Sequence, residues 1–308
     1  MNAIAETLKT AEIVSTHTND ILTVHFLCIE QARDLNILDF REAVDTGALQ
    51  ITEVGEGTVP ELCFNNTGNQ PVFVPEGTII ENLMQNRFVR VSFIINGNTI
   101  LNIPCACVEQ SRWGYENNRM GNHSTYHLYP SLRAINSRAL NRSLRQKQGY
   151  ESYGMQRETW NQIEDRLTST KTDSRTRYLG DYYRDTKNEI DRLTSRIFIP
   201  DDVNGFVALI EGRPIELTIM GSYQLFGNHA QGLMAGIAVE CLEDFRKNLK
   251  TAKQMTYEQF MEAVGKANVE TYPSVGAGSD LRFENKDLVG SALVRGNQLI
   301  HLGVYASI

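Results

Sequence analysis

Two short segments of the chain concentrate side chains that could bind a ligand or take part in chemistry. They are Gln85-Asn86-Arg87 and Cys107-Val108-Glu109-Gln110-Ser111-Arg112-Trp113. Between them, Asn96-Gly97 separates the apolar runs 88–95 and 99–108, and an Asn-Gly pair in that position is typical of a β-hairpin. We therefore expect the hairpin to bring the polar groups at its open end close together.

These side chains suit a phosphorylated ligand that carries an aromatic base. Guanidinium groups bind phosphate oxygens in bidentate geometry, and Arg87, Arg112 and the later Arg133 could supply them. The indole of Trp113 offers a stacking face for a base, whereas carboxylate and amide groups can bind sugar hydroxyls. The expected ligand-binding residues are Gln85, Asn86, Arg87, Arg112, Trp113 and Arg133.

Catalysis at this site would fall to Glu109, acting as a general base towards water. Cys107 shares a strand face with Glu109 because side chains repeat every second residue, but no histidine lies nearby in sequence to activate the thiol. Cys105 and Cys107 are therefore interpreted as small apolar strand residues. A second interpretation stays open, in which a buried Arg87–Glu109 pair only fixes the strand register.

The composition argues against several other classes of protein. The chain of 308 residues has a formal net charge of −7, which argues against general nucleic-acid binding, and it holds no apolar run of 18 residues that could span a membrane. Residues 1–20 lack an apolar signal segment, and the five cysteines show no C-x-x-C pair, so we expect neither secretion nor disulfides. These features predict a cytoplasmic protein without cofactor or metal, and His123 and His127 are interpreted as loop residues.

The pattern of apolar residues predicts a single composite α+β domain over residues 1–308. Residues 1–128 alternate in the manner of an antiparallel, sandwich-like β half, with a helix only around 29–46. Residues 129–198 carry apolar side chains at helical spacing and predict an insertion of two or three helices. Residues 199–308 return to strands and helices that complete the core. The predicted strands are 13–15, 22–28, 49–53, 62–65, 72–74, 88–95, 99–108, 205–210, 214–220, 281–284, 288–294 and 298–305.

Three helical segments carry patterns of their own. Arg138, Arg142 and Arg145 fall on one helix face, where they could bind phosphate groups or form a solvated surface balanced by acids elsewhere. A second helix is expected over 232–250, and the G-x-x-x-G sequence at its start indicates close packing. A capping box, Thr256 with Gln259, predicts the start of another helix.

The two polar segments resemble motifs of a known protein family. Gln85-Asn86-Arg87 is similar to its G-G-K-Q-[ND]-R motif, and residues 107–113 are similar to its [FS]-C-V-E-x-x-R-W motif. The family is the ADP-ribosylglycohydrolase- and rhodanese-phosphatase-associated protein family. Asn82-Leu83-Met84 stands where that family often has Gly-Gly-Lys, which argues against a backbone cradle for the ligand. Weaker similarities, which bring the coverage close to the whole chain, lie at Ser131-Leu132-Arg133, Gln156 with Trp160, residues 204–208 and residues 299–302.

The resemblance implies a cytoplasmic protein that binds an ADP-ribose-like or other NAD-derived nucleotide, and that could also hydrolyse or transfer it. Two alternatives remain. One is a module that sequesters the nucleotide without turnover. The other is a structural or assembly protein, whose polar motif stabilises the β scaffold and whose helical insertion makes subunit contacts in a homo-oligomer. A ligand-induced rise in melting temperature separates the two nucleotide-binding hypotheses from the structural one.

Overall fold

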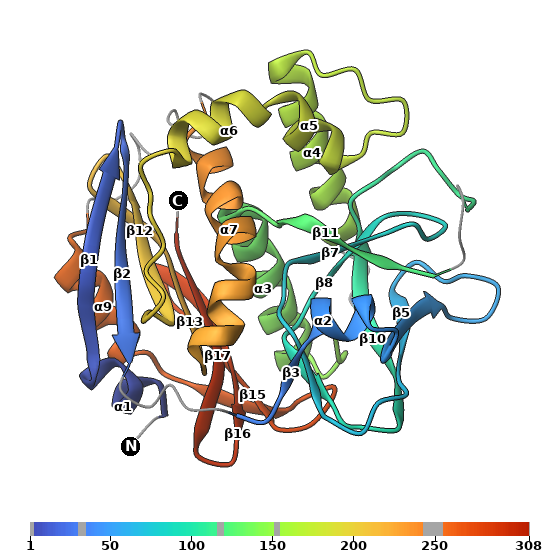
Figure 1. Ribbon diagram of the computed structural model, residues 1–308, viewed down its shortest axis with the longest axis horizontal. Coiled ribbons are helices and arrows are strands. Elements are labelled where there is room, and N and C mark those ends of the chain that lie inside the picture. The colour runs from blue at the N-terminus through green and yellow to red at the C-terminus, as the bar shows by residue number, and fades with distance from the viewer. Residues whose placement is uncertain (1–2, 30–34, 116–119, 151–154, 243–254, 308) are drawn as a thin grey trace.

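The computed structural model describes residues 3–29, 35–115, 120–150, 155–242 and 255–307 (Figure 1). Its largest sheet has eight strands, which come from the N-terminal and the C-terminal parts of the chain. The two parts meet where β2 pairs with β12, from Leu22 opposite Ile210 to Leu27 opposite Gly205. Every pairing in this sheet is antiparallel. In spatial order its strands are β1 (Ala11–Asn19), β2 (Leu22–Ile29), β12 (Gly205–Ile210), β13 (Arg213–Met220), β17 (Gln298–Ala306), β16 (Leu288–Arg295), β15 (Ser279–Glu284) and β14 (Glu270–Pro273).

A second β unit is built from the chain between Leu38 and His127. It contains a six-stranded and a three-stranded sheet, and β3 with β6 forms a parallel pair within the otherwise antiparallel strands. The six strands in order are β11 (Asn122–His127), β7 (Thr78–Glu81), β8 (Arg87–Val89), β10 (Thr99–Cys107), β5 (Glu61–Asn66) and β4 (Leu49–Glu53). The three are β3 (Leu38–Asp39), β6 (Val72–Val74) and β9 (Phe93–Ile95).

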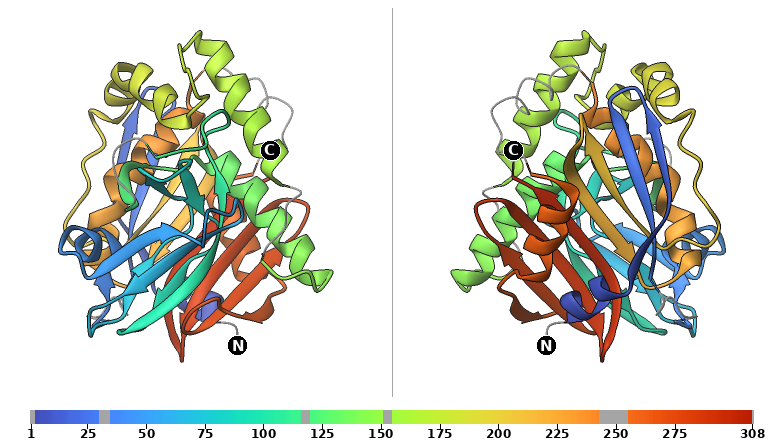
Figure 2. Two further views of the ribbon diagram at one scale, coloured as in Figure 1. Left: turned by 90° about the vertical axis from the view of Figure 1, so that its right-hand side faces the viewer. Right: turned by 90° about the vertical axis from the view of Figure 1, so that its left-hand side faces the viewer.

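Helices fill the space between the two β units (Figure 1). α3 (Pro130–Arg145) packs on β16 and β17, and α7 (Tyr223–Glu240) contacts β13 on one side and β11 on the other. The other helices near this space are α2 (Phe40–Asp45), α4 (Gln156–Thr170), α5 (Leu179–Asp185) and α6 (Lys187–Thr194). Two further helices, α1 (Ala3–Lys9) and α9 (Tyr257–Gly265), contact the opposite face of the eight-stranded sheet (Figure 2). The fold is therefore a β-rich α+β architecture, as predicted.

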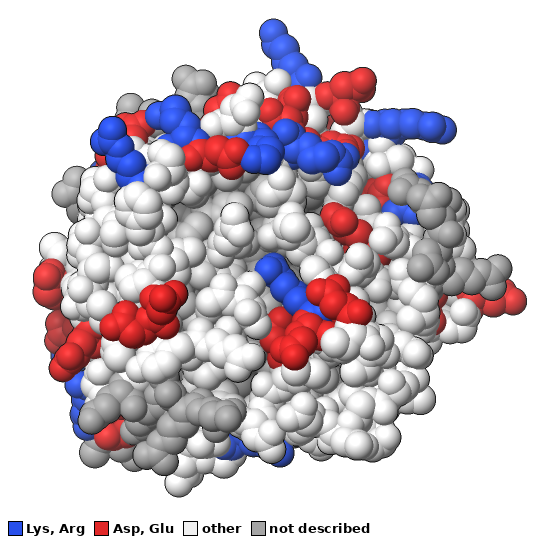
Figure 3. Space-filling model, viewed as in Figure 1, with Lys and Arg blue, Asp and Glu red and all other residues white. Residues whose placement is uncertain are grey.

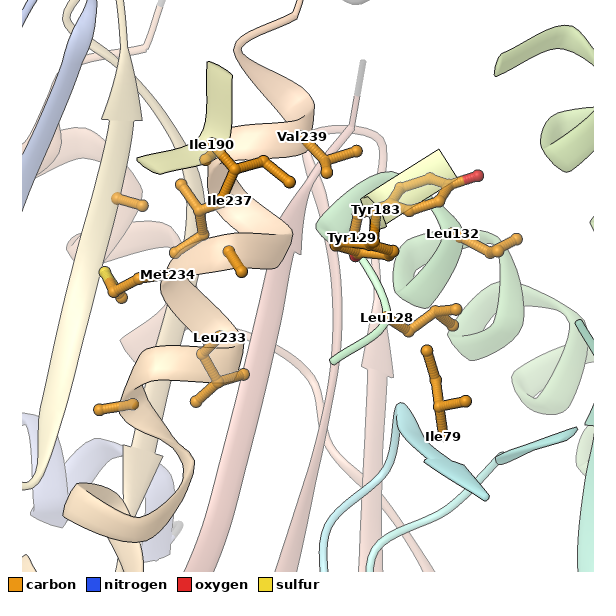
Figure 4. Packing of buried hydrophobic residues seen from close by; sticks show 14 of the residues in the cluster. Ile79, Leu128, Tyr129, Leu132, Tyr183, Ile190, Leu233, Met234, Ile237 and Val239 are labelled. Carbon is orange, nitrogen blue, oxygen red and sulfur yellow. The ribbon is translucent and has the colours of Figure 1, made fainter. Parts of the chain in front are cut away.

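The alternation of side chains in the eight-stranded sheet produces two cores. Phe26 belongs to the core that faces α3 and α7, whereas its neighbour Leu27 belongs to the core beneath α1 and α9, because successive strand side chains point to opposite faces. Figure 4 shows part of the first core, where Ile190 of α6 lies against Ile237 of α7. Within the described residues, no helix is long and apolar enough to cross a membrane.

The predicted hairpin around Asn96-Gly97 is only partly correct. The pairing at its open end is confirmed, because β8 pairs with β10 and places Arg87 opposite Cys107. The strand predicted over 88–95 is wrong, because it divides into β8 and β9, which belong to different sheets. At the break, Arg90 donates to Asn136 Oδ1 and Ser92 bonds His301 Nδ1. These bonds to other elements replace a continuous ladder.

Several other predictions need correction. His123 and His127 lie on strand β11 and not in a loop. The insertion holds four helices among the described residues, α3 to α6, where two or three were expected. α7 begins at Tyr223 and not at residue 232, because the side chain of Ser222 caps it by accepting from Leu225 N at 3.2 Å. Part of the helix expected over 232–250 falls outside the described residues.

Two arginines of the α3 face lie beside acids, as one of its two interpretations expected. Arg145 Nε lies 2.9 Å from Glu270 Oε2, and Arg138 Nε lies 3.9 Å from Glu284 Oε1. Both acids come from the β14–β15 region of the large sheet. Because these acids lie within ion-pair distance, the stripe has less positive charge to offer a phosphate than its sequence indicates.

Candidate functional site

The polar motif forms a buried network at the open end of the β8–β10 pair. Gln85 Nε2 donates to the carbonyl of Gln110 at 3.2 Å, and the Cys107 thiol donates to Gln85 Oε1 at 3.0 Å. The backbone of Cys107 is clamped from the other side by Gln156, whose amide accepts from Cys107 N at 2.8 Å and donates to its carbonyl at 2.9 Å. The sequence therefore correctly predicts that the two segments meet.

Glu109 and Arg112 bind each other in bidentate geometry. Arg112 Nε donates to Glu109 Oε1 at 2.8 Å, and Nη2 donates to Oε2 at 2.7 Å. Arg112 Nη1 also donates to the carbonyls of Leu83 and Gly114, at 2.6 and 2.7 Å. Glu109 Oε2 accepts a further bond from Asn86 N at 3.0 Å. Both charged groups are thus committed to partners inside the protein.

Arg87 pairs with Glu53 and not with Glu109. Its Nη1 lies 2.6 Å from Glu53 Oε2, and the two side chains are 0% and 2% exposed. Burial is the largest single effect and opposes the charge of Arg87, but the attraction of Glu53 together with Cys107 and Cys105 raises the Arg87 pKa. Sequence reasoning missed Glu53, although Leu49, Ile51 and Glu53 alternate along β4 and so predict an acid on the inward face.

The cysteines of the motif are unsuited to nucleophilic chemistry. Burial raises the pKa of Cys107, despite the nearby guanidinium of Arg87. It raises the pKa of Cys105 to about 12. The thiolate is the reactive form of cysteine, and a raised pKa disfavours it. Both cysteines are therefore small buried strand residues, in agreement with their sequence interpretation.

Two of the expected ligand-binding residues lie apart from this network. Arg133 of α3 donates from Nη2 to both oxygens of Glu216 on β13, at 2.7 and 2.6 Å, and is 1% exposed. Trp113 is 49% exposed, with its ring centre 5.9 Å from Arg87 Cζ. The structure thus brings Gln85, Asn86, Glu109 and Arg112 together, but it buries and pairs their polar groups.

A groove of about 1000 Å³ lies elsewhere, between α6, α7, β11 and the chain over 197–203. Figure 3 shows this face, where a basic side chain lies beside acidic ones in a hollow near the centre, next to α2. The apolar lining includes Ile190, Ile197, Phe198, Ile199, Val203 and Met234. The polar lining includes Arg41, Tyr126, Lys187, Tyr223, Gln224, Asn228 and Gln231. No local motif marks this groove, because its residues come from four distant segments.

Metal chemistry finds no support in the donor geometry. Among the residues that the structure describes, no three His, Cys, Asp or Glu side chains are placed to share a metal ion. His123 Nε2 lies 3.1 Å from Asp45 Oδ1, and His229 Nε2 lies 2.6 Å from Asp39 Oδ2. These histidines are used in pairs with carboxylates.

Comparison with protein families places residues 10–305 in one family model, the ARG and Rhodanese-Phosphatase-superfamily-associated Protein domain. The chain belongs to this family. The match includes both polar motifs and nearly the whole fold, which confirms the family resemblance seen in the sequence. No curated protein and no solved structure matches the chain.

Proposed function

We propose that this protein binds an NAD-derived nucleotide of the ADP-ribose type in the groove between α6 and α7. The observation that carries this proposal is the groove itself, about 1000 Å³ in volume with both polar and apolar lining. Small-molecule sites are concave, mostly apolar hollows of roughly 300–1,000 Å³ that hold a few polar groups. The proposed site differs from the motif first considered, where the side chains of Gln85, Asn86, Glu109 and Arg112 are bound to partners inside the protein.

The lining offers a partner for each part of such a ligand. Tyr126, Phe198 and Tyr223 supply aromatic surface for a base. Side-chain amides of α7 supply donors and acceptors for ribose hydroxyls, and Arg41 supplies a guanidinium for phosphate. The ADP-ribose class is taken from the family resemblance, and the groove is consistent with it.

We propose binding without a catalytic role for Glu109. Glu109, the carboxylate expected to act as general base, is 1% exposed and accepts from both Arg112 and Asn86. A general base needs free access to the proton it removes. The motif network instead resembles a buried polar clasp that holds β8, β10 and the adjoining chain together.

Isothermal titration calorimetry with ADP-ribose, NAD and adenosine tests the proposal. A Cβ at Gly227 in α7 would meet no atom within 4 Å, so Gly227→Phe should fill the groove without disturbing the fold and weaken binding at least tenfold. Trp113→Ala is the matched control at the motif, and it should bind as wild type does. Melting temperature should rise with saturating ligand, by an amount that corresponds to about 2.7 kcal/mol at 100 times Kd.

Three results would contradict the proposal. The first is the absence of heat and of thermal protection with both ADP-ribose and NAD. The second is binding that survives in Gly227→Phe but is lost in Trp113→Ala, which would return the site to the motif. The third is product formation by wild type in chromatography, which would replace binding by turnover.

A further inference from the structure

We infer that Arg41 binds a phosphate group of the ligand that occupies the α6–α7 groove. This inference rests on the proposed function and deepens it, because it makes phosphate the required part of the ligand. Arg41 is a residue of α2 that lines the groove. No sequence motif singled it out.

The guanidinium of Arg41 is held against α7. Its Nη1 donates to the carbonyl of Asn228 at 2.7 Å. Its Nη2 comes so close to the helix that a Cβ at Gly232 would lie 3.3 Å from it. A glycine in α7 thus leaves room for the charged end of Arg41 at the wall of the groove. Because the group is fixed before a ligand arrives, little ordering entropy opposes binding.

The carboxylates beside Arg41 are bound to other groups. Asp39 Oδ2 accepts from His229 Nε2 at 2.6 Å, and Asp39 Oδ1 accepts from the backbone N–H of Arg41 at 2.9 Å. Asp45 Oδ1 lies 3.1 Å from His123 Nε2. Within the described residues, no carboxylate forms an ion pair with the Arg41 guanidinium. The two acids nearest Arg41 therefore have histidines as their hydrogen-bonded partners, although their charges still act on the guanidinium.

Arg41 also keeps an unused donor. Its Nε is buried and has no hydrogen-bond partner among the described residues, and such a group costs free energy until it is bonded. Burial lowers the Arg41 pKa even though Asp39 and Asp45 act in the opposite direction. Desolvation of the guanidinium therefore outweighs the attraction of the two acids. A phosphate group in the groove would compensate this charge.

The second cation of the groove is placed differently. Lys187 pairs with Asp191 one turn along α6, and both side chains are more than half exposed. An exposed pair of this kind is well screened by solvent and contributes little. Lys187 is therefore a matched control, since it carries the same charge in the same groove but already has a carboxylate partner.

The experiment compares ADP-ribose with adenosine, which lacks phosphate, for binding to wild type, Arg41→Gln and Lys187→Gln. We expect Arg41→Gln to weaken ADP-ribose at least tenfold and to leave adenosine unchanged. Lys187→Gln should change either affinity less than threefold. Arg41→Lys keeps the charge but loses the planar fork, and it should fall between wild type and Arg41→Gln. Circular dichroism and melting curves show that each variant is folded.

The outcomes distinguish the role of Arg41 from nucleotide binding in the groove. If ADP-ribose binds wild type and Arg41→Gln equally, the role of Arg41 is overturned. The groove remains the proposed binding site in that case. If Lys187→Gln loses as much as Arg41→Gln, the phosphate is not bound specifically at Arg41. If neither ligand binds wild type, the proposed function itself fails. Should Arg41→Gln prove unfolded, equal binding of ADP-ribose to a folded Arg41→Lys and to wild type would still overturn the role of the arginine fork.

Discussion

At the scale of single residues, the family motif is organised around charged groups that are fully enclosed. Arg87 and Glu53 are nearly inaccessible to solvent, and Glu53 Oε1 also accepts from Met84 N at 2.9 Å. One carboxylate therefore fixes both an arginine on β8 and the chain before it. Two charges that are buried together stabilise a fold only as long as both are present.

Glu53→Ala should consequently destabilise the protein by about 3–5 kcal/mol, because it leaves the Arg87 charge buried without its partner. The measurement is the free energy of unfolding from urea denaturation. Glu6→Ala is the control, since Glu6 pairs with Lys9 at the surface with both side chains about half exposed, and it should cost less than 1 kcal/mol. A loss at Glu53 no larger than that of the control would show that the pair is not a structural clasp.

The sequence indicated which residues of the motif meet but not how they pair. Hairpin and strand periodicity are local, so they correctly predicted that Gln85 to Arg87 approach Cys107 to Glu109. The partner of Arg87 lies 34 residues away on β4, and Glu216 lies 83 residues beyond Arg133. Such pairings depend on how distant strands are arranged in sheets, and no spacing rule within one segment encodes them.

At the scale of elements, α7 approaches β11 through its glycines. A Cβ at Gly232 would lie 2.7 Å from the carbonyl oxygen of Thr125, and one at Gly236 would lie 3.3 Å from that of His127. The close packing that the G-x-x-x-G sequence predicted is thus confirmed, and its partner is a strand. This contact also forms one wall of the groove.

Gly232→Ala should destabilise the protein by about 1–3 kcal/mol, because the added methyl group would press on the backbone of β11. Gly227→Ala, in the same helix, has open space at the Cβ and should stabilise it by about 0.5–1 kcal/mol through better helix propensity. Thermal denaturation of both variants measures the contrast. Equal effects of the two substitutions would mean that α7 and β11 can move apart without cost.

Elements with strong local signals were predicted closely. The bounds of β4, β6 and β12 match the prediction, and the capping box at Thr256 opens α9. Sequence reasoning missed four of the described strands, namely β3, β7, β11 and β14. β3 has two residues and β14 has four, whereas β7 and β11 lie beside the polar motif, where apolar alternation is weak. The break between β8 and β9 was missed for a different reason. Its cause is tertiary, namely the bonds that Arg90 and Ser92 make to α3 and β17.

At the scale of the whole molecule, hydrogen-bonded polar side chains join the two β units. Glu76, which precedes β7, accepts from Tyr305 Oη of β17 at 2.7 Å and from Ser291 Oγ of β16 at 3.2 Å. Ser92 reaches His301 of β17 at 2.9 Å. The units are thus registered against each other by directional bonds in addition to the shared apolar core.

Acidification should weaken this junction. Burial lowers the pKa of His301 to about 3, whereas an unfolded histidine titrates near 6.5. The unfolded state therefore binds more protons between these values, and stability falls as the pH is lowered through that window. From pH 7 to pH 5, His301 should account for about 2 kcal/mol of lost stability. Denaturant titrations at both pH values should show that His301→Asn loses about 2 kcal/mol less than wild type.

His17→Asn on the edge strand β1 is the control for this comparison, because His17 is partly exposed. Its loss of stability between pH 7 and pH 5 is compared with that of His301→Asn. If His301→Asn retains the full loss between pH 7 and pH 5, other groups must carry the pH dependence and the assignment to His301 is wrong.

During synthesis, β2 cannot pair with β12 until the chain up to β12 has been made. Ile29 N bonds the side chain of Asn204 across 175 residues, so β2 waits for its neighbour while the ribosome makes the chain between them. At roughly 5–20 residues per second this wait lasts about 10–35 s. Leu22, Val24 and Phe26, fully buried in the folded protein, can pair with β1 but lack β12 throughout that time. We therefore expect the nascent chain to offer chaperones an apolar strand during that interval.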